Sequence, residues 1–169
     1  MTPIFKNNGT GARCRLLIIL SALELTTSAH AATATASFAV TATVQATCLI
    51  SATAMAFGTY TGVQADTTST ISVTCTTSTP YTVGLNAGLA TGATVTTRKM
   101  VGPSAATLAY SLSSDGPRAV NWGMTVPTDT VAGTGNGSAQ ALTVYGRIAA
   151  AQFVAPGAYS DTVTATITY

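Results

Sequence analysis

The stretch Ala32–Cys48, ATATASFAVTATVQATC, alternates without a break. Its even positions are all apolar or small, and its odd positions are Thr, Ser or Gln, apart from Ala39. A period of two indicates an extended strand with one buried face. At about 3.3 Å per residue the run would extend over roughly 55 Å, whereas a strand is usually about 5–6 residues long. The run therefore either bends and is used twice, or its first half pairs with a partner elsewhere.

The residues before this run have the features of a secretory signal peptide, which we expect over Met1–Ala31. Three basic residues precede an apolar core at Leu16–Leu25, and Ala29-His30-Ala31 fits a small-x-small cleavage site. The alternative is a membrane anchor, but the apolar core has about 10 residues and a spanning helix needs about 20. We therefore expect a secreted chain that begins at Ala32.

The chain after cleavage would contain neither histidine nor glutamate, since His30 and Glu24 lie in the signal segment. Histidine, the most common general base and metal ligand, is then missing. We therefore expect that the chain is not an enzyme and that it has no metal, no cofactor and no small-molecule substrate. From residue 32 onward the chain has four basic residues and four aspartates, so its net charge is zero. No basic field is present to attract nucleic acid or anionic lipid, so neither is an expected partner.

Two cysteines, Cys48 and Cys75, remain once Cys14 is removed with the signal segment. Both lie on the apolar phase of an alternating segment. In a secreted chain they pair in one way only, so we expect an inward-facing disulfide between neighbouring strands. Closing a loop of about 28 residues would stabilise the fold by roughly 3–4 kcal/mol. The alternative is a pair of reduced cysteines in the core.

Further alternating segments recur along the chain, separated by turns rich in Gly, Pro, Asn or Asp. Short strands with such punctuation predict one all-β domain, a β-sandwich. We expect Trp122 in the core or in a groove wall, the Arg98-Lys99 pair in a solvated turn, and Arg147 in an exposed ion pair. The expected strands are residues 70–76, 81–85, 107–113, 141–148 and 159–169.

The last of these strands stops at Tyr169 and places four residues in one phase: Val163, Ala165, Ile167 and Tyr169. In a complete sandwich of the immunoglobulin type, a further strand would close this edge. An open edge leaves backbone groups and the core beneath them unprotected. Three occupants can cover it: the amino-terminal strand of the same chain, a chaperone, or the amino-terminal strand of the next copy.

Several short motifs follow one another in a distinctive order. They are VQATC at 44–48, FGTY at 57–60, ISVTC at 71–75, LAYSL at 108–112, WG at 122–123, VYGRI at 144–148, PGAYSDTV at 156–163 and TITY at 166–169. With the cysteine pair and the terminal aromatic, this order resembles the spore coat protein U domain family. That family includes subunits of archaic chaperone–usher pili of the Csu type.

The resemblance implies an incomplete immunoglobulin-like β-sandwich completed by donor-strand exchange, a mode of strand addition. It implies secretion through the periplasm to the cell surface, with a periplasmic chaperone, an outer-membrane usher and homologous subunits as partners. We expect residues 32–43 to form the donor segment, with Phe38, Val40 and Ala42 entering the next copy's groove. Residues 44–169 would form the pilin domain.

The edge residues Val163, Ala165, Ile167 and Tyr169 would contact the chaperone or the incoming strand. Such a subunit would be a structural part of a pilus that supports adhesion and biofilm formation. Two alternatives stay open. One is a secreted spore-coat or surface-layer protein of the same fold, and the other is a monomeric sugar-binding module.

Overall fold

The structure, a computed structural model, describes residues 30–169. All but the last two residues of the expected signal peptide, and Cys14 with them, lie outside the described residues. The described residues 30–41 and the residues from Ala42 onward belong to two separate units, and each is described by itself. Residues 30–41 form no strand and are exposed. Within residues 30–169, no helix has the length and apolar character needed to cross a membrane.

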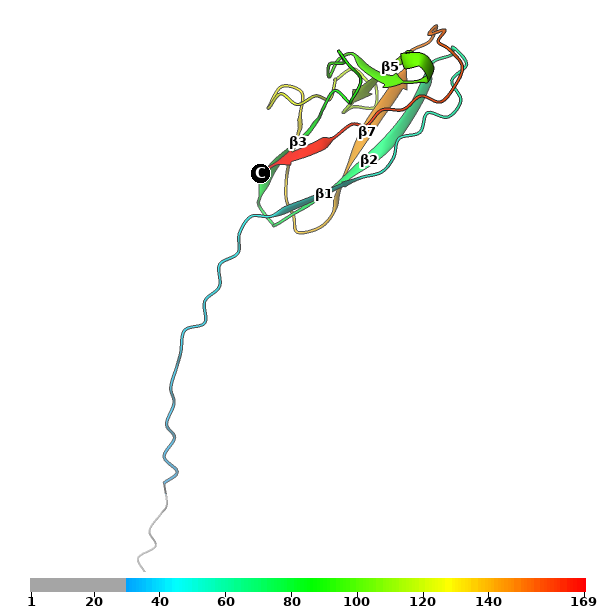
Figure 1. Cartoon of the computed structure of the whole chain (residues 1–169). Coiled ribbons are helices and arrows are strands. Elements are labelled where there is room, and N and C mark those ends of the chain that lie inside the picture. The colour runs from blue at the N-terminus through cyan, green and yellow to red at the C-terminus, as the bar shows by residue number, and fades with distance from the viewer. Residues whose placement is uncertain (1–29) are drawn as a thin grey trace, which may run out of the picture. The chain divides into compact units, whose positions relative to one another are not determined.

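Two antiparallel sheets make up the second unit (Figure 1). One sheet has five strands in the order β1-β2-β7-β5-β4, and the other has three in the order β6-β3-β8. The longest strand, β2, pairs with β1 on one side and β7 on the other. The elements are β1 (Cys48–Ala52), β2 (Ala65–Cys75), β3 (Pro80–Leu85), β4 (Arg98–Val101), the 3-10 helix η1 (Pro103–Ala105), β5 (Thr107–Ser113), β6 (Val131–Thr134), β7 (Gln140–Ile148) and β8 (Ala165–Thr168).

The core lies between the two sheets and follows the period-two pattern of the sequence. Along β2 the alternate residues Ile71, Val73 and Cys75 are buried, while the Thr and Ser residues between them are more exposed. Val144 and Ile148 are buried in the same alternating way on β7, and so are Leu108, Tyr110 and Leu112 on β5. This alternation buries one face of each strand, which makes the strands the stable local conformation for these residues.

The expected strands at 70–76, 81–85, 107–113 and 141–148 are present as β2, β3, β5 and β7, with β2 five residues longer at its start. The expected strand at 159–169 is shorter, because only β8 pairs with β3. Residues 32–47 form no strand, and the first strand begins at Cys48. An extended run needs neighbours for its backbone groups, and these residues have no ladder partner within the described chain.

Candidate functional site

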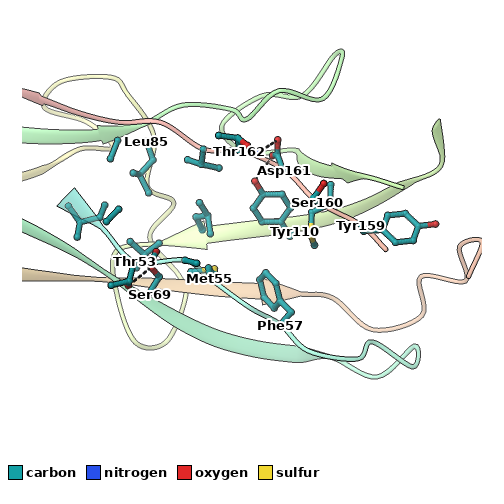
Figure 2. A pocket seen from close by; sticks show the side chains of 18 residues that line it. Thr53, Met55, Phe57, Ser69, Leu85, Tyr110, Tyr159, Ser160, Asp161 and Thr162 are labelled. Carbon is teal, nitrogen blue, oxygen red and sulfur yellow. Dashed lines mark hydrogen bonds between the residues drawn. The ribbon is translucent and has the colours of Figure 1, made fainter. Parts of the chain in front are cut away.

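A groove of about 400 Å³ opens between the two sheets at one side of the sandwich (Figure 2). Its floor is made of core side chains from both sheets: Ile71, Leu85, Leu112 and Val144. All four side chains are almost completely buried in the core, and they also line the groove. The groove is therefore an opening into the hydrophobic core.

One side of the groove is the segment of residues 53–57, which we call the amino-terminal rim. It continues β1, and its first residue is still attached to β2 through the bond from Thr53 N to Thr70 O, at 2.9 Å. Among the described residues, the backbone groups of residues 54–57 make no hydrogen bond. Met55 and Phe57 point inward and line the groove. This rim therefore offers free backbone donors and acceptors above an apolar wall.

The opposite side is the segment of residues 159–165, which we call the carboxy-terminal rim. Its half-buried residues alternate with exposed ones, and Val163 and Ala165 face the groove. Within the described residues, the backbone of Val163 makes no hydrogen bond either. Two rims with unpaired backbone groups and an apolar floor between them match the requirements of an extended peptide.

The carboxy-terminal rim passes from one sheet to the other. At its start, Ser160 exchanges two backbone hydrogen bonds with Val101 at the end of β4, in the five-stranded sheet. From Ala165 onward the chain pairs with β3 in the three-stranded sheet. This crossing explains why the expected strand at 159–169 is not one continuous ladder.

Polar side chains hold the rim where it crosses. The Asp161 carboxylate accepts hydrogen bonds from Leu89 N at 2.8 Å and from the Tyr110 hydroxyl at 2.6 Å. Burial, together with the bond to Asp161 and its charge, raises the pKa of Tyr110 above its ordinary value. Tyr110 thus stays a neutral donor at physiological pH, and its ring forms part of the groove wall (Figure 2).

Arg98 is wholly buried, which shows that the expectation of a solvated turn was wrong. It begins β4, and its guanidinium donates to four backbone carbonyls, those of Leu85, Asn86, Val95 and Trp122, at 2.7–2.8 Å. Burial lowers the pKa of Arg98 below that of an exposed arginine. The charge is tolerated because backbone dipoles replace water around it.

Trp122 and Arg147 occupy the environments expected of them. Trp122 is 1% exposed and donates from its indole N–H to Val83 O at 2.8 Å, so it belongs to the core. Arg147 forms an ion pair with Asp66 at 2.7 Å on the outer face of the β2–β7 pair. The hydrogen bond from Arg147 holds the pKa of Asp66 below its ordinary value. Neither residue lines the groove.

A second cavity, of about 730 Å³, continues the groove at one end. The two share four lining residues: Met55, Phe57, Met100 and Tyr159. This cavity lies among the loops near Ala65 and Ile148, which pair where β2 begins and β7 ends. Phe153, at 89% exposure, lies at its edge. The groove with its extension is therefore longer than the two rims alone.

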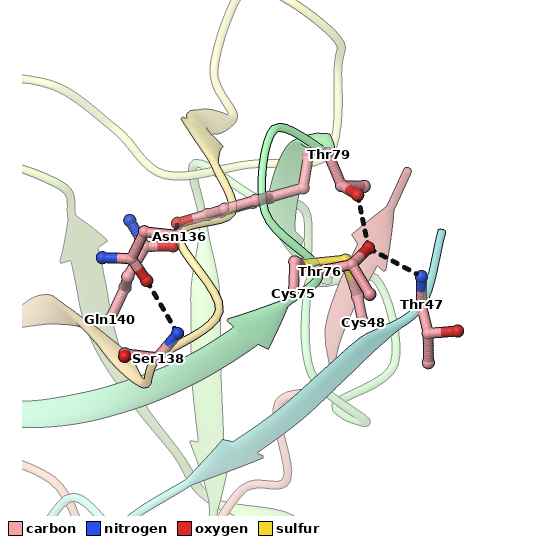
Figure 3. The surroundings of a disulfide bond; sticks show 9 residues. Thr47, Cys48, Cys75, Thr76, Thr79, Asn136, Ser138 and Gln140 are labelled. Atoms are coloured by element: carbon pink, nitrogen blue, oxygen red, sulfur yellow. Dashed lines mark hydrogen bonds between the residues drawn. A yellow bond between two sulfur atoms is a disulfide. The ribbon is translucent and has the colours of Figure 1, made fainter. Parts of the chain in front are cut away.

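The disulfide joins Cys48 to Cys75, as expected (Figure 3). These residues face each other at the end of the β1–β2 ladder, where β1 begins and β2 ends. Next to the bridge, Thr76 N donates to Thr47 O and the Thr76 hydroxyl accepts from Thr47 N. The residues just before Cys48 therefore join the domain where β2 ends, whereas the second cavity lies near the start of β2.

Comparison with known proteins gives the family. The Spore Coat Protein U domain family matches residues 34–166. The chain belongs to this family. No curated protein matches the chain.

A solved structure shows the same fold. It is that of the chaperone–tip adhesion subunit pre-assembly complex from the archaic chaperone–usher Csu pili of Acinetobacter baumannii. The match has a TM-score of 0.59 and 22% identity, and it covers 75% of this chain and 41% of the other. The chain described here therefore spans about two fifths of the matched chain, and it is an all-β, immunoglobulin-like sandwich.

The structure places the residues proposed for the site as follows. Phe38 and Val40 are more than 80% exposed and lie in the first unit, while Ala42 is exposed at the start of the second. Val163 and Ala165 line the groove. Ile167 packs against the core beyond the groove, and Tyr169 is 58% exposed.

Sequence reasoning gave no role to four side chains that shape the groove: Met55, Phe57, Tyr110 and Asp161. Phe57, Tyr110 and Asp161 all lie in the short motifs on which the resemblance to the spore coat protein U domain family rests. Their place in those motifs was the signal in the sequence that could have indicated a role for them. Their meeting at one groove depends on long-range pairing, which the motifs do not specify.

Proposed function

We propose that this chain is a structural, non-enzymatic subunit of a chaperone–usher pilus that polymerises by donor-strand complementation. The observation that carries the proposal is the groove, whose apolar floor is flanked by two rims with unpaired backbone groups. Family membership and the fold of the Csu complex support the same assignment.

The proposed occupant is the segment of residues 32–43 from another copy. Its alternation would place Phe38, Val40 and Ala42 against the groove floor, while its backbone pairs with both rims. In this proposal residues 1–31 are removed on export and residues 44–169 form the acceptor domain. Burying Phe38 contributes about 1.5–3 kcal/mol, and the backbone bonds add to it.

The same groove would be covered by a periplasmic chaperone before assembly, with an outer-membrane usher exchanging chaperone for subunit. The carboxy-terminal rim and β8 then serve both partners in turn, through Val163, Ala165, Ile167 and Tyr169. The assembled pilus would lie on the cell surface and support adhesion and biofilm formation.

The test is export of the full precursor to the periplasm, followed by unboiled gels. The native chain is expected to give a ladder of oligomers, and deletion of residues 32–43 should abolish it. Phe38→Asp should also abolish the ladder while the disulfide forms normally, because a carboxylate would be placed against an apolar floor. Ser37→Asp is the matched control, since residue 37 lies on the opposite phase and the ladder should persist.

Equal ladders for Phe38→Asp and Ser37→Asp would refute the proposed donor face. A native chain that stays monomeric with or without residues 32–43 would refute polymerisation by strand exchange altogether.

The family description itself favours one second candidate, a secreted coat or surface-layer protein. Strand exchange can build either assembly. Isolated pili that contain this chain would decide for the first candidate. Its recovery only in a coat fraction would decide for the second.

A further inference from the structure

The carboxy-terminal rim is held by side chains at the point where strand ladders end. Its Ser160 is bonded to β4 and its Ala165 to β3, which belong to different sheets. Between these two anchors the chain has four residues, and none of them belongs to a ladder. Something other than sheet pairing must therefore fix the direction in which this part of the rim faces.

Asp161 fixes the start of this crossing. Its Oδ1 accepts from Leu89 N and from Thr162 N, both at 2.8 Å, and its Oδ2 accepts from the Tyr110 hydroxyl at 2.6 Å. One carboxylate thereby links the rim to the loop after β3 and to β5. These three elements come from both sheets, so the carboxylate ties the sheets together at the groove.

The loop after β3 is shaped to receive this carboxylate. Gly88 has a φ of +85°, and a Cβ at this position would collide with the Asp161 carboxylate. Asn86 adds a second attachment, since its side-chain oxygen accepts from Thr164 N at 2.9 Å and its own N–H donates to Thr164 O at 3.1 Å. Both ends of the crossing are thus bound to the same loop.

Arg98 holds that loop from the core side. Its guanidinium donates to Leu85 O and Asn86 O, each at 2.8 Å. The chain of contacts therefore runs from the buried guanidinium through the loop at residues 85–89 to the carboxylate on the rim. Between the two bonded residues Asp161 and Thr164 lies Val163, whose side chain faces the groove and whose backbone groups are unpaired among the described residues.

We propose that Asp161 is a positioning residue for strand acceptance. It fixes the sheet crossing so that the unpaired backbone of Val163 faces the groove before any donor arrives. This inference rests on the proposed function and adds that the Asp161 carboxylate helps to set the acceptor rim in advance. A rim fixed in this way costs less ordering when the donor binds, which favours fast association.

The experiment measures capture of a donor peptide. The acceptor is the full chain carrying Phe38→Asp, which cannot donate its own strand in this proposal. The probe is a fluorescent peptide with the sequence of residues 32–47. Asp161→Ala is expected to slow peptide association about tenfold, the effect of losing hydrogen bonds to a charged group.

Two further variants separate positioning from general stability. Asp161→Asn keeps an acceptor oxygen for the two backbone N–H groups and should restore most of the association rate. Asp115→Ala is the matched control: it removes a carboxylate that accepts from Ala119 N and Val120 N in a loop away from the groove. It should change the unfolding temperature to a similar extent and leave association unchanged.

If Asp161→Ala unfolds the domain, Tyr110→Phe tests the same role, because it deletes only the hydroxyl that bonds to Oδ2 of Asp161. This variant should slow peptide association about threefold. Unchanged association in both Asp161→Ala and Tyr110→Phe overturns the positioning role while strand acceptance stands. Failure of the Phe38→Asp acceptor to capture any peptide overturns the proposed function instead.

Discussion

Replacement of Arg98 by methionine tests whether a buried cation organises the domain. Methionine keeps much of the aliphatic volume and removes all four bonds to carbonyl oxygens, which are 2.7–2.8 Å long. Two of those carbonyls, on Leu85 and Trp122, accept in fully buried positions. They would lose their side-chain donor in a place that water reaches poorly.

The magnitude follows from two opposing effects. Hydrogen bonds to a charged group contribute about 1.5–3 kcal/mol each, but an arginine with no exposed surface also carries a large desolvation cost. Removing one partner of a buried charged network typically costs about 3–5 kcal/mol. For a domain of this size, we expect the unfolding temperature to fall by roughly 10–20 °C.

The assay is thermal unfolding followed by circular dichroism with the disulfide intact. Lys99→Met is the matched control, since it removes the same charge from the next residue of β4, which points to the other face of the strand. It should change stability by about 0.5 kcal/mol or less. Equal unfolding temperatures for the two variants would refute the reasoning, because the four carbonyl bonds would then contribute nothing net.

Three further predictions concern the same domain. Cys75→Ala should lower the free energy of unfolding by about 3–4 kcal/mol in urea titrations, since the bridge closes a loop with a sequence separation of 27; no loss would show that the reduced chain is already constrained. The raised pKa of Tyr110 means that stability is full below about pH 10 and declines as the pH rises above it, because the unfolded chain releases that proton first. Tyr110→Phe should flatten this decline in unfolding measured between pH 9 and 11, and an unchanged slope would contradict the assignment. Gly88→Ala should cost over 1 kcal/mol more than Gly92→Ala, because both have positive φ but only the first new Cβ meets the Asp161 carboxylate; similar losses would exclude that contact.

The period-two pattern predicted most strands because burial on one face is a local property. Ile71, Val73 and Cys75 are spaced for one face wherever the strand lies in the sheet. The cysteine pairing followed from elimination, and the alternating phase correctly placed both sulfurs toward the core side. For these features, the residues that carry the signal are also the residues that form the structure.

Features that depend on distant partners escaped the pattern. The strand β4 begins with a basic pair that resembles a surface turn, because three of the four carbonyl oxygens around Arg98, those of Leu85, Asn86 and Trp122, belong to residues at least 12 positions away in the sequence. The four-residue strand β6 includes Gly133 and is too short to display alternation. The sheet crossing at Asp161 interrupts a regular apolar phase that continues on both sides of it. In each case the deciding contact lies at least a dozen residues away.

The position of the disulfide determines how the domain would respond to tension applied ahead of Cys48. An antiparallel pair that is pulled from one end separates like a zipper, breaking its hydrogen bonds one at a time. The β1–β2 pair runs from Cys48↔Cys75 to Ala52↔Ile71, so the covalent bond replaces the first pair that would open. Force entering at that point passes directly into β2, which is hydrogen-bonded to neighbours on both sides. Mechanical failure would then require many bonds to shear at once, and a reducing agent would turn the same domain into one that peels open strand by strand.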